Sequence, residues 1–260
     1  IEQILLAEKP DVMLVYGDTN STLAGALAAV KLHVPVAHVE AGLRSFNISM
    51  PEEVNRILTD RVSQWLFTPT DTAAAHLVNE GLSAGQIISV GDVMYDVALH
   101  HGAKVNAHGR ILGELKSEYG VKPEEYCLTT VHRAENTNDP SRLKTIVDAL
   151  IAFSDETPIV WPLHPRTRGY LKEIGLFNKL NQSVHLIDPV GYLDMLQLEK
   201  YAALISTDSG GVQKEAFFCH VPCVTLRDET EWVELIEAGW NRLSPPESKD
   251  SVLSSLRDAI

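Results

Sequence analysis

The fold of this chain is decided by the stretch Leu204-Ile205-Ser206-Thr207-Asp208-Ser209-Gly210-Gly211-Val212-Gln213-Lys214-Glu215-Ala216-Phe217. We interpret it as a buried strand, a tight two-glycine turn and the start of a helix. Gly210 and Gly211 have no Cβ, so backbone can approach a ligand closely, and Ser209 can cap the helix. The N–H groups of that helix start would face a phosphate, and Glu215 is placed to accept hydrogen bonds from ribose hydroxyls. The alternative is an ordinary strand–turn–helix connection whose glycines serve packing.

Length and composition indicate a soluble globular protein. The chain has 260 residues, 45% of them hydrophobic and 22% charged, which suffices for one large or two ordinary α/β domains. No apolar run is long enough to cross a membrane. The N-terminal residues Ile1–Leu6 lack the basic flank and the small-residue cleavage site of a signal peptide. We therefore expect a cytoplasmic protein without membrane association.

Charge, cysteine content and missing motifs exclude several classes of function. A formal net charge of −13 argues against a nucleic-acid-binding surface. The three cysteines, Cys127, Cys219 and Cys223, form neither a disulfide framework nor a zinc site, and no histidine pair has a convincing metal spacing. Neither G-x-G-x-x-G nor G-x-x-x-x-G-K-[ST] is present, which gives dinucleotide redox chemistry and P-loop phosphoryl transfer little support. We predict no metal and no cofactor.

Short apolar runs alternate with helical patterns along the chain. In the first half the strand-like runs lie at Asp11–Tyr16, Val34–Val39, Trp65–Thr68 and Ile87–Val90. In the second half they lie at Tyr126–Val131, Ile159–Trp161, Val184–Ile187, Ala203–Thr207 and Pro222–Leu226. The periodicity is lost between Gly102 and Gly109, where we place a domain boundary. This order predicts an α/β fold of two doubly wound, Rossmann-like domains, residues 1–104 and 105–260.

Carboxylates follow the first two predicted strands. Asp18 and Glu40 each lie just past a strand end, and the carboxyl ends of neighbouring parallel strands share the edge where ligands bind. Asp18 has the alternative role of a helix cap, whereas Glu40 has no obvious capping role. Glu52 and Glu53 begin a helix after Pro51, where acids complement the helix dipole without needing an active site.

His132 and Arg133 follow the strand that opens the second half. An imidazole beside a guanidinium at a strand end suits phosphate binding. His164 also follows a strand, but a lone histidine in such a place is more often structural than catalytic.

Six ordered motifs across essentially the whole chain resemble those of the non-hydrolysing UDP-N-acetylglucosamine 2-epimerases. They are Gly17-Asp18-Thr19-Asn20-Ser21-Thr22, His38-Val39-Glu40-Ala41-Gly42-Leu43-Arg44, Pro51-Glu52-Glu53-Val54-Asn55-Arg56, His132-Arg133-Ala134-Glu135-Asn136, His164-Pro165-Arg166-Thr167 and Thr207-Asp208-Ser209-Gly210-Gly211. The resemblance implies a glycosyltransferase-B-like fold, in which two Rossmann-like domains with parallel sheets face each other across a cleft. It also implies a homodimer that acts on a UDP-sugar.

Carried over by position, the resemblance assigns the site residues. The implied catalytic residues are Asp18, Glu40, Glu52 and His132. The implied UDP-binding residues are Ser209, Gly210, Gly211 and Glu215, and Arg133 joins the substrate-binding set beside His132.

The implied reaction inverts C2 of the sugar by eliminating UDP to a 2-acetamidoglucal and adding it back. The proton then returns to the opposite face of C2, so acid/base groups are needed on both sides of one carbon. Three carboxylates at one cleft edge can supply them, and which is acid and which is base stays open. A helix N-terminus with His132 and Arg133 would stabilise the departing diphosphate.

The chain also departs from the family pattern. Lys214 stands where the family commonly has a second acid. The family's first strand and its phosphate-contacting turn precede the part that matches this chain, which implies an incomplete first domain. The family's final helix, which returns to the first domain, has no counterpart here, which implies a shortened C-terminus. The segment Thr230–Glu234 resembles the branch that acts on 2,3-diacetamido uronic-acid sugar nucleotides at least as well. A glycosyltransferase and an inactive nucleotide-binding module are the competing classes.

Overall fold

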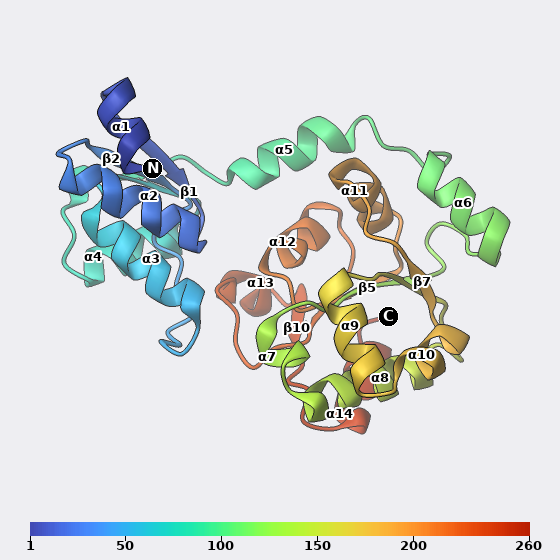
Figure 1. Ribbon diagram of the computed structural model, residues 1–260. Helices are drawn as coiled ribbons and strands as arrows, with labels where there is room; N and C mark the ends of the chain where they lie inside the picture. Colours follow the sequence, from blue (N-terminus) through green and yellow to red (C-terminus); the bar gives the residue numbers. More distant parts are fainter. The chain divides into compact units, whose positions relative to one another are not determined.

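The structure is a computed structural model that describes residues 1–260, and its chain folds into two α/β units, Ile1–Val93 and Met94–Ile260 (Figure 1). The first unit holds a sheet of four parallel strands in the order β1-β2-β3-β4. The strands are β1 (Met13–Tyr16), β2 (Val36–Val39), β3 (Trp65–Thr68) and β4 (Ile87–Ser89). All four fall within the predicted runs.

One helix precedes β1, and the other helices of the first unit connect consecutive strands. The helices are α1 (Glu2–Glu8), α2 (Asn20–Lys31), α3 (Pro51–Val62), α4 (Asp71–Asn79) and the short 3-10 helix η1 (Ala84–Gln86). Helix α2 starts where the Thr19 side chain accepts a hydrogen bond from the backbone N–H of Thr22. Pro51 fits the first turn of α3 because that turn needs no backbone donor.

The second unit holds six parallel strands in the order β10-β9-β8-β5-β6-β7. They are β5 (Cys127–Thr130), β6 (Ile159–Pro162), β7 (His185–Ile187), β8 (Leu204–Thr207), β9 (Cys223–Thr225) and β10 (Asn241–Leu243). The chain winds outward from β5 to β7, returns to β8 beside β5, and winds outward again to β10. The strand order therefore reverses between β5 and β8, and such a switch point is where open α/β sheets bind ligands.

The second unit has ten helices. They are α5 (Val93–Gly102), α6 (Arg110–Tyr119), α7 (Ala134–Thr137), α8 (Pro140–Phe153), α9 (Pro165–Glu173), α10 (Phe177–Ser183), α11 (Tyr192–Lys200), α12 (Gly210–Phe218), α13 (Val233–Glu237) and α14 (Lys249–Arg257). None of the helices in the structure is long and apolar enough to cross a membrane.

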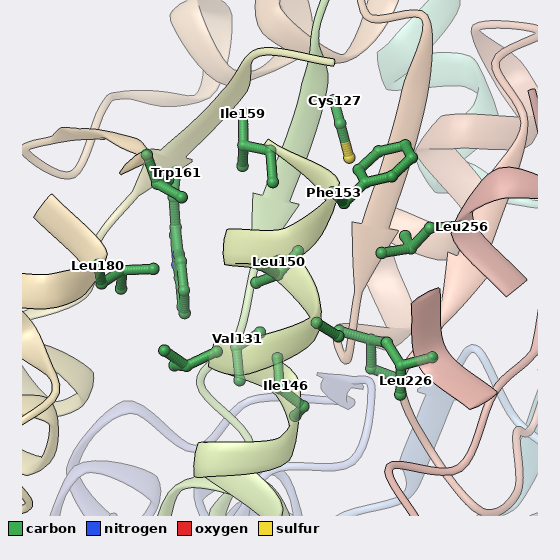
Figure 2. Packing of buried hydrophobic residues seen from close by; sticks show 14 of the residues in the cluster. Cys127, Val131, Ile146, Leu150, Phe153, Ile159, Trp161, Leu180, Leu226 and Leu256 are labelled. Carbon is green, nitrogen blue, oxygen red and sulfur yellow. The ribbon is translucent and has the colours of Figure 1, made fainter. Parts of the chain in front are cut away.

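Two apolar cores cover the faces of the six-stranded sheet, because neighbouring residues of a strand point to opposite faces. On β5, Cys127 faces one core and Leu128 the other; on β6, Trp161 and Val160 divide in the same way. Figure 2 shows the first core, where side chains of α8 such as Leu150 lie between Trp161 of β6 and Leu256 of α14. Helices α6, α11 and α12 supply the second core.

The division between the units lies between Val93 and Met94, whereas the loss of periodicity pointed to residues 104 and 105. Helix α5 belongs almost entirely to the second unit. The Tyr95 ring packs on Phe218 of α12 with ring centroids 4.8 Å apart. The Lys200 Nζ donates a hydrogen bond to the carbonyl of Gly102 at 2.8 Å. These contacts, distant in sequence, fix α5 to α11 and α12.

Candidate functional site

The switch point of the second unit brings the loop after β5 next to the loop after β8. Strands β5 and β8 pair in register from Cys127 and Leu204 to Thr130 and Thr207. At the end of this ladder the Thr130 and Thr207 hydroxyls hydrogen-bond each other at 2.6 Å. The predicted residues His132 and Arg133 and the predicted turn Ser209–Gly211 thus start from the same edge.

Asp208 ties these two loops together. Its carboxylate is fully buried and accepts hydrogen bonds from the backbone N–H of His132 at 3.0 and 3.1 Å and of Arg133 at 3.0 Å. The side-chain amide of Asn136 donates a further bond at 3.0 Å. A buried carboxylate is tolerated when it accepts several donors of this kind. Asp208 therefore sets the course of the backbone that presents His132.

Helix α12 begins at this edge. The Ser209 hydroxyl accepts a hydrogen bond from the backbone N–H of Val212 at 3.4 Å and caps the helix as predicted. A Cβ added to Gly210 would clash with Oε1 of Glu231, so a larger residue fits there only if the Glu231 side chain shifts. At Gly211 the nearest atom to an added Cβ is Cε of Met94, at an ordinary 3.5 Å.

Glu231 belongs to a buried charge cluster beside the start of α12. Nη1 of Arg227 lies 2.9 Å from Oε2 of Glu231, and Nε of Arg227 lies 3.4 Å from Oε1 of Glu135. Nη2 of Arg133 approaches Oε1 of Glu231 at 4.0 Å. The pKa of Glu135 is raised chiefly by burial, which the Arg227 charge opposes. The cluster holds two arginines and two carboxylates next to the predicted phosphate turn.

The pKa of His132 lies below its ordinary value. Removal of water by the surrounding protein is the main cause, the charge of Asp208 opposes it, and the charges of Arg133 and His164 add to it. Nδ1 of His132 lies 3.6 Å from Oδ1 of Asp208. A largely neutral imidazole at pH 7 follows, and such a group can accept or donate a proton.

A cavity of about 200 Å³ lies against His132. Its lining comes from β5, β6, α11, α12 and their loops: Thr130, Val131, His132, Pro162, His164, Pro189, Val190, Met195 and Val212. Most of these side chains are apolar. Such a lining suits a group with little charge.

Glu215 lies in the second turn of α12 and is 6% exposed. Its carboxyl interacts with the Glu199 carboxyl and the Tyr192 hydroxyl of α11. Burial is the main cause of its raised pKa. Glu215 thus shares a helix with Ser209, Gly210 and Gly211.

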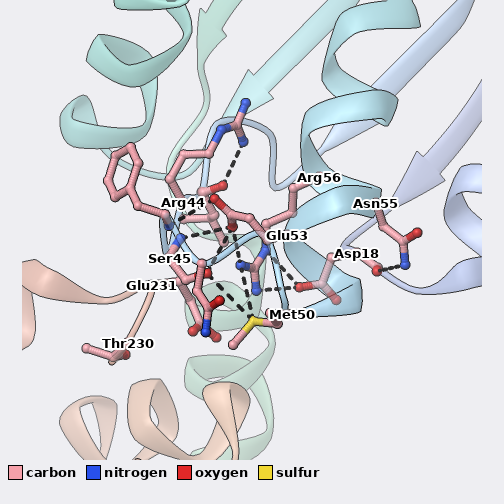
Figure 3. Close-up of polar contacts among 12 residues, drawn as sticks. Asp18, Arg44, Ser45, Met50, Glu53, Asn55, Arg56, Thr230 and Glu231 are labelled. Carbon is pink, nitrogen blue, oxygen red and sulfur yellow. Dashed lines mark hydrogen bonds and ion pairs between the residues drawn. The ribbon is translucent and has the colours of Figure 1, made fainter. Parts of the chain in front are cut away.

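Asp18 lies in the turn after β1 of the first unit, as predicted. Oδ2 of Asp18 accepts hydrogen bonds from Nε of Arg56 at 3.0 Å and from Nη2 at 2.7 Å (Figure 3). Its backbone carbonyl accepts a bond from the Asn55 side chain at 2.8 Å. Thr19, not Asp18, caps α2, so the alternative role of Asp18 as a helix cap is wrong.

Glu40 follows β2. Its side chain lies beside Gly17, the residue that precedes Asp18. The backbone of Glu40 has φ 73°, an uncommon left-handed conformation for a non-glycine residue. A Cβ added to Gly17 would lie 3.4 Å from Oε2 of Glu40, so this carboxylate lies over the turn that carries Asp18. Strands β1 and β2 pair from Met13 and Val36 onward, which aligns the two turns.

The two acids at the start of α3 have different environments. Glu52 is partly exposed, as a residue that meets a substrate must be. Glu53 is 1% exposed, and its carboxylate accepts hydrogen bonds from the backbone N–H of Ser45 at 2.9 Å and of Phe46 at 3.0 Å (Figure 3). Arg56 reaches it at 2.9 Å. Glu53 therefore does more than complement the helix dipole, because its carboxylate anchors the loop before α3.

His38 and Asp60 are buried side chains that hold the turns after β1 and β2 in place. Nδ1 of His38 lies 2.7 Å from Oδ1 of Asp60, and Nε2 of His38 lies 2.8 Å from the carbonyl of Gly17. Arg44 pairs with Oδ2 of Asp60 at 2.8 Å. All three side chains are buried.

Several residues of these arrangements were not predicted from the sequence: Arg56, His38, Asp60, Asp208, Asn136, Arg227 and Glu231. Most lie inside the recognised motifs, which was the only available signal. Asp60, Arg227 and Glu231 lie outside the six motifs. Glu231 falls in the segment Thr230–Glu234, which was considered only for its resemblance to another branch of the family, and the four-residue spacing of Arg227 and Glu231 is also common on solvated surfaces.

Comparison with known proteins agrees with this architecture. A family model described as UDP-N-acetylglucosamine 2-epimerase matches residues 1–260. A Methanococcus maripaludis protein named UDP-N-acetylglucosamine 2-epimerase homolog is 53% identical over 98% of this chain and 70% of its own length. A Pseudomonas aeruginosa UDP-2,3-diacetamido-2,3-dideoxy-D-glucuronate 2-epimerase is 53% identical over 100% of this chain and 70% of its own.

Solved structures show the same fold. The crystal structure of Methanocaldococcus jannaschii UDP-GlcNAc 2-epimerase in complex with UDP-GlcNAc and UDP superposes with a TM-score of 0.92 at 46% identity, covering 99% of this chain and 71% of that one. The Neisseria meningitidis UDP-GlcNAc 2-epimerase bound to UDP-GlcNAc gives a TM-score of 0.87 at 32% identity, covering 99% and 70%.

Two parallel-sheet Rossmann-like units, with a capped helix start at the switch point of the second, define the α/β class of glycosyltransferase-B-like proteins. Within it, the chain belongs to the UDP-N-acetylglucosamine 2-epimerase family, whose members are isomerases. The predictions of fold and family are confirmed.

Proposed function

We propose that this protein is a UDP-N-acetylglucosamine 2-epimerase that interconverts UDP-N-acetylglucosamine and UDP-N-acetylmannosamine. The observation that carries the proposal is the convergence of His132, Arg133 and the capped start of α12 on one edge through Asp208. Relatives of known structure with this fold are crystallised with UDP-GlcNAc.

In our proposal the second unit binds UDP. The backbone N–H groups at Ser209–Gly211 and the Arg133 guanidinium take the diphosphate, since helix starts and arginines bind anions. Glu215 accepts hydrogen bonds from ribose hydroxyls. The apolar cavity beside His132 takes the uracil ring.

The first step breaks the C1–O bond to UDP and removes the proton from C2, leaving a C1=C2 double bond in 2-acetamidoglucal. The electron pair of the C1–O bond leaves with UDP, so stabilising the diphosphate lowers this barrier. In the second step a UDP oxygen adds back to C1, and C2 takes a proton on the opposite face.

Asp18, Glu40, Glu52 and His132 are our proposed acid/base groups for these proton transfers. Arg56 orients Asp18, because two of its nitrogens donate hydrogen bonds to one Asp18 oxygen. The lowered pKa of His132 keeps its imidazole neutral at pH 7, which is the form that can accept a proton.

Product analysis in deuterated water tests the reaction. We expect UDP-N-acetylmannosamine with deuterium at C2, together with traces of free UDP and 2-acetamidoglucal. An epimerised product without deuterium would contradict elimination and re-addition. Free UDP that appears only with an added acceptor would indicate a glycosyltransferase instead.

A second candidate substrate is the 2,3-diacetamido-2,3-dideoxy glucuronate analogue. The specific observation in its favour is that the Pseudomonas aeruginosa relative named for that substrate is as similar to this chain, at 53%, as the first relative. The kcat/KM values for the two UDP-sugars, measured side by side, decide between them.

We further propose that the enzyme is a cytoplasmic homodimer, as the family resemblance implies. Light scattering at micromolar concentration tests the dimer, and cell fractionation tests the location.

A further inference from the structure

Glu199 is a buried carboxyl group that the proposed reaction does not use. It lies on α11, is 0% exposed, and neither of its carboxyl oxygens has a hydrogen-bond donor within reach. A carboxylate buried without donors is strongly unfavourable, so the group must either bind a proton or find a partner.

The partner is Glu215 on the neighbouring helix α12. The two helices pack against each other, and the two carboxyl groups interact directly. Two acceptors cannot hydrogen-bond without a proton between them. A proton on Glu199 supplies the missing donor and satisfies both groups at once.

The surroundings decide which carboxyl carries the proton. On the Glu215 side, the Tyr192 hydroxyl interacts with the carboxyl and the Lys214 charge favours its ionised form. On the Glu199 side, burial and the Glu215 charge both raise the pKa well above its ordinary value. The other titratable groups near the pair are Cys219, Tyr126 and Cys223. Lys200 follows Glu199 in the chain and interacts with Cys219, and the His101 ring packs on Tyr192.

We propose that Glu199 is a positioning residue that carries a proton, donates it as a hydrogen bond to the Glu215 carboxylate, and so holds Glu215 in the orientation that accepts the ribose hydroxyls of UDP. The role of Glu215 in this sentence rests on the proposed function. Two substitutions separate the roles. Glu199→Gln keeps a donor of the same shape, and Glu199→Leu fills the same buried space without one.

The first measurement is infrared spectroscopy of the unliganded full chain at neutral pH. We expect a carbonyl absorption of a protonated carboxylic acid in the parent that disappears in Glu199→Gln. Glu173→Gln, which changes an exposed glutamate of α9, is the matched control and keeps the absorption. A parent spectrum without this absorption would refute the shared proton.

The second measurement is UDP affinity by calorimetry. We expect Glu199→Leu to weaken UDP binding by about tenfold or more, the usual effect of losing a hydrogen bond to a charged group, while Glu199→Gln stays within about threefold of the parent. Rescue by Gln and not by Leu marks orientation of Glu215 rather than packing.

The outcomes of the two inferences differ. A parent that does not bind UDP contradicts the proposed function and, with it, the positioning role. A parent that binds UDP while Glu199→Leu binds it equally well leaves the proposed function intact and overturns the positioning role alone.

Discussion

The carboxylate of Asp208 holds the backbone of His132 with both oxygens, which accept its N–H at 3.0 and 3.1 Å. The two residues are 76 positions apart in the chain. One buried side chain thereby fixes the loop after β5 to the loop before α12. The order of the candidate diphosphate site therefore depends on the hydrogen bonds of Asp208 to this loop.

Asp208→Asn should lower both stability and UDP affinity. The amide oxygen replaces one acceptor, but the amide nitrogen then faces backbone N–H groups that are left without a partner, at a cost of about 1–3 kcal/mol each. We expect a lower melting temperature and a UDP affinity reduced by about tenfold. Asp188→Asn is the matched control, because Asp188 is exposed and its ion pair with Arg168 contributes about 0–1 kcal/mol. Equal effects of the two substitutions would contradict the anchoring role.

Gly210→Ala should damage the start of α12, and Gly211→Ala should not. The added methyl at Gly210 meets Oε1 of Glu231, which cannot move away without weakening its buried pair with Arg227. Overpacking of this kind costs about 1–3 kcal/mol. Thermal unfolding of both variants measures the difference, and calorimetry with UDP shows whether the helix start is needed. Two variants of equal stability would show that Glu231 relaxes freely.

Glu40→Gln and Glu52→Gln should each lower turnover by roughly a hundredfold or more and leave UDP affinity nearly unchanged. The isosteric amide removes a proton carrier and so weakens the transition state rather than ground-state binding. Steady-state kinetics of the full-length enzyme, with Glu8→Gln on α1 as the exposed control, measures the effect. A variant that turns over at the parental rate would identify the wrong carboxylate.

Glu53→Gln, one residue away, should behave differently. Its carboxylate accepts two backbone N–H groups and faces Arg56, so the amide leaves a buried cation without its full partner. We expect a loss of stability that exceeds the loss seen for Glu52→Gln. Urea unfolding of the two neighbours gives the comparison, and the reverse order would show that Glu53 only complements the helix dipole.

The Glu199–Glu215 pair makes stability depend on pH in a defined direction. The folded-state pKa of Glu199 lies above its unfolded value, so the folded protein binds the proton more tightly. The stability that this proton contributes is fully present below the pKa of Glu199 in the unfolded chain, and it is lost as pH rises through the pKa of Glu199 in the folded protein. Glu199→Gln should therefore raise the melting temperature at alkaline pH and lose this advantage in acid. A melting-temperature difference that is independent of pH would contradict the raised pKa.

Most of the fold could be predicted because buried parallel strands appear as short apolar runs. Strand β3 has the predicted bounds, Trp65–Thr68. Strand β10 was missed because Asn241–Leu243 is three residues long and carries an exposed arginine. Helix α5 was not predicted, and the boundary was placed after it, because its place depends on distant contacts with α11 and α12.

The site was harder to predict than the fold. The turn residues Asp18 and Ser209 could be placed because motifs and strand ends mark them, and the structure puts each in its turn. Asp208 could not be singled out, because its four hydrogen bonds come from a loop that only the folded sheet brings near. The Glu199–Glu215 pair could not be predicted for the same reason, because the two acids meet only when α11 packs against α12.

The late return of the chain to the middle of the second sheet has a consequence for synthesis on the ribosome. Strand β5 is complete at Thr130, but its inner neighbour begins only at Leu204. Until β8 emerges, the hydrogen-bonding edge of β5 stays open to strands of other nascent chains. We expect nascent chains arrested before Leu204 to bind chaperones or self-associate, and those released after Leu226 to do so much less, as sedimentation of stalled ribosome complexes can measure. On this expectation, the strand that completes the candidate nucleotide site also closes the edge through which nascent chains would aggregate.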